Sequence, residues 1–138
     1  VSPDVEFVHT TVFLNTLIEQ GQIKLNRRNG TATYHDPCIL VNDLDITEAP
    51  RKIIAALGYE IKEPVYSRED THCCGGPKGA RIGDSRLNDM VRAMRVKELK
   101  VTDADFYVTS CPTCKAVLTD SKMRNLSELV AEQLTDER

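Results

Sequence analysis

The five cysteines of this 138-residue chain form one pattern, C-x34-C-C-G-x35-C-x2-C, made of Cys38, Cys73, Cys74, Cys111 and Cys114. Cysteine is a good buried residue, but burial alone does not explain a Cys-Cys pair and a Cys-x-x-Cys pair that both lie in stretches rich in Gly and Pro. The pattern joins three segments that are far apart along the chain. It therefore favours a fold that brings these segments to one place.

Strand and helix patterns alternate along the sequence. A helical period of apolar residues predicts helices over about residues 4–20, 47–57, 85–100 and 127–134, and Pro112 predicts the first turn of a short helix. The apolar face of the 85–100 helix is predicted to consist of Leu87, Met90, Val91, Met94 and Leu99. Short strands are predicted from residue 31 to just before Cys38, over 59–64 and over 105–110.

This alternation predicts an α/β layered fold with a mainly parallel sheet flanked by helices. Cys38 follows the first predicted strand, the Cys73-Cys74 pair lies in the loop after the second, and Cys111 follows the third. Since ligands of such sheets gather at the carboxyl ends of the strands, the three cysteine loops are expected at that edge.

Composition excludes several classes of partner. Eighteen basic and twenty-one acidic residues give a net charge of -3, and no basic run is present, so nucleic acid is not expected as a partner. No apolar stretch approaches the roughly 18 residues of a membrane span, and the first residues lack signal-peptide features. We expect a cytoplasmic domain, associated with a membrane only through partner subunits.

Because the chain begins at Val1, residues 1–138 are interpreted as one domain of a longer protein.

The thiols favour metal ligation over disulfides. Their number is odd, no secretory signal is present, and a bond between the adjacent Cys73 and Cys74 would strain the backbone. Cys111 and Cys114 lie one helical turn apart and can face one centre. A structural zinc takes four ligands and the chain offers five, whereas adjacent thiols can reach two neighbouring irons. A polynuclear centre is favoured, while a zinc-stabilised interaction module and a cofactor-free dithiol oxidoreductase using Cys111 and Cys114 stay open.

The residues beside the cysteines suggest supporting roles. Glycines in the central motif can adopt positive φ and let backbone N–H groups approach the centre; those predicted to contact it are Gly75, Gly76 and Gly79. Cations near the cysteines would offset the negative charge of a thiolate centre; the candidates are Lys78, Arg81 and Lys115.

Two histidines are candidate catalytic residues. His35 and His72 precede a cysteine by three residues and by one residue. Either could donate a hydrogen bond to sulfur or deliver a proton during cleavage of a substrate disulfide. Asp36 is predicted to cap the turn into Cys38, and no role is assigned to His9.

Three stretches carry a resemblance to a known family: "YHDPC" before the first cysteine, "HCCGG" in the middle and "TSCPTC" at the end. With "PRKIIAALGYEIKE" between the first two, the chain resembles the cysteine-rich CCG domain, in particular a C-terminal one. That domain occurs in the B and D subunits of heterodisulfide reductase and in the iron-sulfur subunit of glycolate oxidase. Family members usually carry two such domains, and this chain holds one.

The resemblance implies a function and a ligand set. It implies a [4Fe-4S] cluster, noncubane in heterodisulfide reductase, held by Cys38, Cys73, Cys74, Cys111 and Cys114. Such a domain would carry electrons and reduce a disulfide, or serve an organic-acid system. Its partners would be other oxidoreductase subunits that supply electrons from a flavin or a ferredoxin-type centre.

Overall fold

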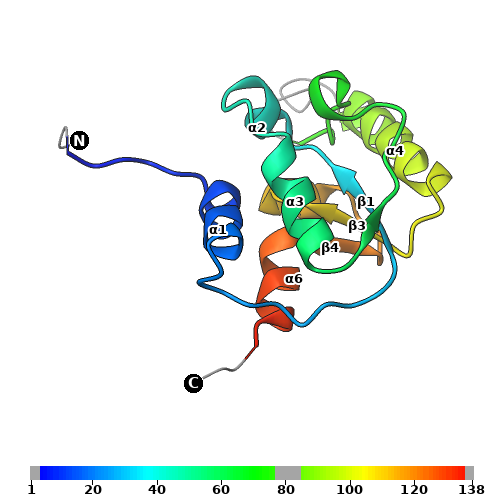
Figure 1. Cartoon of the computed structure of the whole chain (residues 1–138). Helices are drawn as coiled ribbons and strands as arrows, with labels where there is room; N and C mark the ends of the chain where they lie inside the picture. The colour runs from blue at the N-terminus through cyan, green and yellow to red at the C-terminus, as the bar shows by residue number, and fades with distance from the viewer. Residues whose placement is uncertain (1–3, 77–84, 136–138) are drawn as a thin grey trace.

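The computed structural model describes residues 4–76 and 85–135 and confirms the predicted α/β architecture. Its parallel strands follow the order β2-β1-β3-β4, with bounds β1 Thr31–His35, β2 Glu60–Ile61, β3 Phe106–Thr109 and β4 Met123–Asn125. The helices are α1 Thr10–Glu19, α2 Cys38–Asn42, α3 Glu48–Ala56, the 3-10 turn η1 Arg68–Asp70, α4 Ser85–Val101, α5 Pro112–Val117 and α6 Leu126–Gln133. Figure 1 shows these helices arranged around the sheet.

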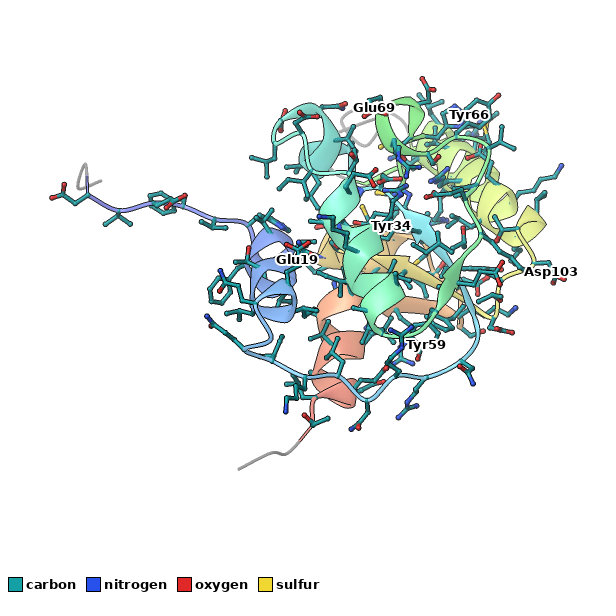
Figure 2. The ribbon with its side chains drawn as sticks, viewed as in Figure 1. Glu19, Tyr34, Tyr59, Tyr66, Glu69 and Asp103 are labelled. Atoms are coloured by element: carbon teal, nitrogen blue, oxygen red, sulfur yellow. The ribbon has the colours of Figure 1, made fainter. Side chains whose placement is uncertain are left out.

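The sheet buries both of its faces. In one layer, Tyr34 of β1, labelled in Figure 2, belongs to a cluster with Val108 of β3 and apolar residues of α3 and α6. In the other, Tyr107 of β3 packs with Leu99 of α4. Since successive strand residues point to opposite faces, Tyr34 and its neighbour His35 belong to different layers.

Helix α1 is shorter than predicted. It begins at Thr10 rather than near residue 4, and the His9 side chain caps it by accepting a hydrogen bond from the Thr11 N–H at 3.2 Å. The apolar residues ahead of the cap lie in solvent, with Phe7 78% exposed. Periodicity extended the prediction over residues that the fold leaves exposed.

The buried face of α4 also differs from the prediction. Leu99 is buried as expected, but Leu87, Met90 and Met94 are exposed, and Arg95 is fully buried in their place. Arg95 can face inward because its guanidinium finds hydrogen-bond acceptors there, so the polar groups of the neighbouring segments decided the orientation of the helix.

Three short elements were missed or misjudged. The pattern predicted neither α2 nor β4, and β2 is only two residues long where residues 59–64 were expected. Elements of two to five residues have too few positions to show a period. They form because their neighbours pair with them, as β4 does with β3.

A buried arginine ties the end of β1 to α3 and to the segment after β2. Arg51 forms a two-pronged ion pair with Asp36, at 2.7 and 2.9 Å, and also binds Glu63 and the Thr47 carbonyl. The same Asp36 carboxylate accepts the Arg68 N–H at 2.9 Å. Asp36 therefore anchors the segment that leads to Cys73 rather than capping the turn into Cys38 as predicted.

Replacing Arg51 should strongly destabilise the fold. Arg51→Met leaves the Asp36 carboxylate, whose side chain is 0% exposed, without its cation. We expect the free energy of unfolding to fall by about 3–5 kcal/mol. The adjacent Lys52→Met is the matched control, because Lys52 pairs with Glu19 in solvent and its loss should leave the urea midpoint nearly unchanged. Equal midpoints for the two variants in urea unfolding would contradict this account.

Candidate functional site

All five cysteines line one cavity of about 360 Å³. The cavity lies where β1 and β3 end, and its walls come from the start of α2, the segment before Gly76, and α5; its other lining residues include His9, Pro37, Ser110, Pro112 and Thr113. None of the cysteines forms a disulfide. The structure thus brings together three segments that the sequence separates by more than thirty residues each.

The pairing of β1 with β3 places Cys38 next to Cys111. His35 and Thr109 are register partners at the ends of these parallel strands. Cys38 follows His35 by three residues and begins α2, while Cys111 follows Thr109 by two and precedes α5. Cys114, one turn into α5, then lies at the same edge.

The adjacent Cys73 and Cys74 reach the cavity on a loop held from both sides. Thr71 donates a hydrogen bond to the Asp36 carbonyl at 3.1 Å. Gly75 has φ +78°, and a Cβ there would stand 2.9 Å from the Asn88 carbonyl oxygen of α4. The residue packs against α4 and does not line the cavity, but its N–H donates to Cys73 Sγ at 3.4 Å. Glycine is required here for both conformation and contact.

Gly76 does line the cavity. A Cβ at this position would stand 3.1 Å from Cys74 Sγ and 3.3 Å from the Thr113 methyl group. A side chain would occupy space directly beside the sulfur, so the absence of one keeps this wall open.

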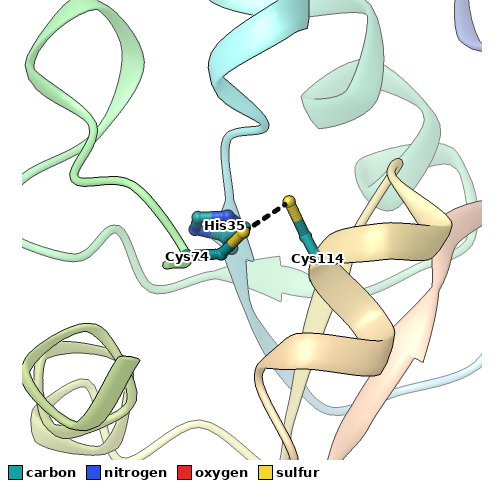
Figure 3. A group of neighbouring side chains, drawn as sticks. All are labelled: His35, Cys74 and Cys114. Carbon is teal, nitrogen blue, oxygen red and sulfur yellow. Dashed lines mark hydrogen bonds between the residues drawn. The ribbon is translucent and has the colours of Figure 1, made fainter. Parts of the chain in front are cut away.

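The thiols perturb one another. Cys114 donates a hydrogen bond to Cys74 Sγ at 3.3 Å, drawn as the dashed line in Figure 3. This bond and the His35 ring beside the sulfur lower the pKa of Cys74. The pKa of Cys114 is raised because hydrogen bonds to Cys111 and Cys74 hold its proton and burial disfavours its thiolate. The site thus stabilises thiolate charge at some sulfurs at the expense of others.

Two of the three partly exposed cysteines are perturbed in opposite directions. The neighbouring Cys114 thiol and the backbone N–H groups of Cys114 and Thr113 lower the pKa of Cys111 to about 6. Burial and the neighbouring Cys73 and Cys74 raise the pKa of Cys38.

His35 is not among the residues that line the cavity, but its ring lies beside the lining residue Cys74, as Figure 3 shows. It is 1% exposed. Its Nδ1 accepts a hydrogen bond from Nε of the buried Arg95 at 2.9 Å, and its Nε2 is buried with no hydrogen-bond partner among residues 4–76 and 85–135. Burial lowers the pKa of His35, and the charge of Arg95 acts in the same direction. A neutral imidazole with one unsatisfied nitrogen therefore stands next to the sulfurs.

His72 lies away from the cavity. Its Nδ1 is 2.6 Å from Glu98 Oε1, and its ring stacks on Tyr66 at 4.0 Å between centroids. It is not among the residues that line the cavity. The proton-donating role predicted for His72 stays a prediction, and this geometry adds no support to it.

The predicted cations are placed as follows. Lys78, Gly79 and Arg81 lie outside the described residues. Lys115 binds the Glu128 carboxylate at 2.7 and 2.6 Å and does not line the cavity.

Sequence reasoning overlooked two residues. His9 lines the cavity from the N-terminal side although its sequence neighbourhood contains no cysteine. Arg95 contacts His35 across 60 positions of sequence. The one available signal for Arg95 was its position four residues before Leu99, which places it on the inward side of the helix.

A family model described as CCG, a cysteine-rich domain, matches residues 32–119. The chain belongs to the CCG cysteine-rich domain family. The match spans β1 to the residues just after α5 and includes all five cysteines. No solved structure matches the chain.

Several proteins that contain a similar segment are named for redox functions. The chain is 37% identical to a subunit of dihydromethanophenazine:CoB–CoM heterodisulfide reductase from Methanosarcina mazei, over 94% of this chain and 34% of that protein. It is 35% identical to a probable membrane-anchored ferredoxin of Chromohalobacter salexigens, over 91% and 20%. It is 31% identical to an uncharacterized iron-sulfur protein of Methanococcus maripaludis, over 81% and 22%.

The chain thus spans about a third or less of the length of these relatives. Among the described residues, none of the helices has the length and apolar character needed to cross a bilayer.

The opposite pKa shifts of Cys111 and Cys38 predict different alkylation profiles in protein that is reduced and treated with a chelator. The rate at Cys111 should level off above about pH 7, because its thiolate is then almost fully formed, whereas the rate at Cys38 should still be rising at about pH 9. Peptide mass spectrometry after timed iodoacetamide exposure measures both rates in one sample. Both thiols are partly exposed, so access is comparable. Coincident profiles would contradict these shifts.

Proposed function

We propose that this domain binds an iron-sulfur cluster through Cys38, Cys73, Cys74, Cys111 and Cys114 and carries electrons for an oxidoreductase. The observation that carries the proposal is the gathering of all five thiols around one cavity. Relatives that contain a similar segment are named as a ferredoxin, an iron-sulfur protein and a subunit of heterodisulfide reductase. The family and the donor set thus point to the same chemistry.

The residues present fit such a group. Five sulfur donors exceed the four that a structural zinc takes. Gly76 leaves open the space that a Cβ would fill beside Cys74, and the Gly75 N–H donates to the Cys73 sulfur. Amide donors of this kind stabilise charge on ligating sulfur. A bound cluster would supply one-electron redox chemistry at this edge of the sheet.

The depth of the cysteines gives the site an inner and an outer side. Cys74 and Cys114 are buried, while Cys38, Cys73 and Cys111 are partly exposed. The inner pair would hold the centre against the core and exclude water there, and the outer three would leave it reachable from the surface. We propose that electrons arrive on the outer side from another subunit that carries a flavin or a ferredoxin-type centre.

Reduction of a disulfide is the substrate chemistry that we propose for the complete protein. It rests on the name of the heterodisulfide reductase relatives, of which this chain covers about one third. In that role the partly exposed rim of the cavity would receive the disulfide.

A second candidate is a zinc-stabilised interaction module. One observation favours it: a ring nitrogen of His35 and the sulfurs of Cys74 and Cys114 are all buried and lie within 4.8 Å of one another. A single ion with nitrogen and sulfur ligands can bridge such a group.

Anaerobic reconstitution separates the two candidates. We expect about four irons and four sulfides per chain and a redox-active EPR signal. Cys74→Ser should abolish that signal because it removes a buried donor. Thr113→Ser, which alters the same wall without removing a thiol, should keep it. One zinc per chain with no stable cluster under these conditions would overturn the iron-sulfur proposal.

Filling the space at Gly76 should impair cluster uptake without unfolding the domain. We expect Gly76→Ala to lower iron content severalfold, since the added methyl group stands against Cys74 Sγ. Gly21→Ala is the control, because nothing lies within 4 Å of its new Cβ. The substitution is still strained, because φ at this position is +67°. It should cost roughly 1 kcal/mol of stability and leave iron content unchanged. Iron analysis and thermal unfolding of both variants test this prediction. A Gly76→Ala protein that retains full iron content would contradict it.

A further inference from the structure

His35 stands at the site with one of its nitrogens already engaged. Arg95 donates from Nε to His35 Nδ1 at 2.9 Å. A guanidinium has only donors and stays protonated in proteins, so the acceptor in this bond must be the lone pair of Nδ1. The proton of the neutral imidazole is then on Nε2.

Arg95 is held firmly enough to dictate this arrangement. It is 0% exposed. Its Nη1 group donates to the Tyr66 carbonyl at 2.8 Å and to Glu98 Oε2 at 2.9 Å, and its Nη2 group lies 3.5 Å from Thr71 Oγ1. These contacts orient the plane of the guanidinium and point its Nε–H at His35. Turning Arg95 away would leave a buried charge without its partners, which is costly.

The Nε2–H of His35 lacks an acceptor among the described residues of the protein. Buried polar groups are nearly always paired, so an imidazole that served only to satisfy Arg95 would be expected to find a second partner. Nε2 has none there, yet the ring lies beside Cys74 (Figure 3), and a ring nitrogen is within 4.8 Å of the sulfurs of Cys74 and Cys114. A sulfur atom at this site is therefore the acceptor that we expect for the Nε2–H group of His35.

We propose that Arg95 fixes His35 as an Nε2–H hydrogen-bond donor to sulfur at the site and thereby keeps His35 out of the metal's ligand set. Ligation through Nε2 needs a lone pair on that nitrogen, which requires the proton on Nδ1, and Arg95 already occupies Nδ1. Arg95 is a positioning residue in this scheme, acting through His35. The effect on a cluster rests on the function proposed above, whereas the tautomer of His35 does not.

The tautomer can be read directly by nitrogen-15 NMR of the full chain labelled at histidine, reduced and kept with a chelator. The proton–nitrogen correlation pattern of His35, assigned by its loss in His35→Gln, should show the proton on Nε2. A proton on Nδ1, or a mixture of the two forms, would overturn the proposal. This measurement uses the unaltered protein and does not depend on cluster formation.

Arg95→Met should release the constraint, and the His35 pattern should change to a mixture or to the other tautomer. Arg92→Met is the matched control: it removes the same group from the same helix, but Arg92 pairs with Asp89 at the surface. The control should keep the Nε2–H pattern. An unchanged pattern in a folded Arg95→Met protein would show that Arg95 does not set the tautomer.

Two further readouts test the consequence for the metal. In reconstituted protein, His35→Leu should shift the reduction potential downward, because it removes a donor to sulfur, whereas His35→Gln can retain an amide donor and should shift it less. In zinc-treated protein, His35 should keep its proton on Nε2; movement of that proton to Nδ1 on zinc binding would reveal ligation and overturn the proposal. If no cluster forms even in the unaltered chain, the proposed function fails while the NMR result still decides the role of Arg95.

Discussion

The parallel pairing of β1 with β3 is the interaction on which the rest of this structure depends. It aligns His35 with Thr109, so the chain leaves both strands at the same edge and delivers Cys38 and Cys111 to one cavity. The alternation of side chains along β1 sends Tyr34 into the layer of α3 and α6 and His35 toward α4. One register therefore determines both the position of two thiols and the helix that His35 meets.

Two buried arginines then secure the end of β1 from its two sides. Arg51 of α3 donates hydrogen bonds to Asp36, and Arg95 of α4 donates one to His35. The consecutive residues His35 and Asp36 are therefore held by helices on opposite faces of the sheet. The Arg51–Asp36 contact is a buried ion pair, and removing one partner of such a pair is costly. Through Asp36 this geometry extends to Arg68 and Thr71, the residues that lead into Cys73 and Cys74. These polar contacts add to the apolar packing of Cys74 and Cys114 against Leu99 and Tyr107.

Much of this organisation could be predicted from local pattern. Strands ending before Cys38 and Cys111, the helix after Pro112 and the parallel sheet each leave a strong signature in sequence. The wrong prediction for the buried face of α4 has a physical cause. Met90 and Met94 fit an apolar stripe yet lie in solvent, while Arg95 is buried, because a charge can enter a core only where distant residues supply acceptors. The periodicity of α4 carries no information about Tyr66 or His35, which accept hydrogen bonds from Arg95.

The sequence by itself determined the α/β class, the family and the five cysteines proposed as ligands, because residue type and spacing are local properties of the chain. Only the tertiary structure decided how those donors meet and what surrounds them. It placed His35 beside Cys74 and His72 against Glu98 and Tyr66, although both histidines are close to a cysteine in sequence. The physical reason is that a side chain's role depends on which partners fill its hydrogen bonds, and Arg95 for one and Glu98 for the other come from a different part of the chain.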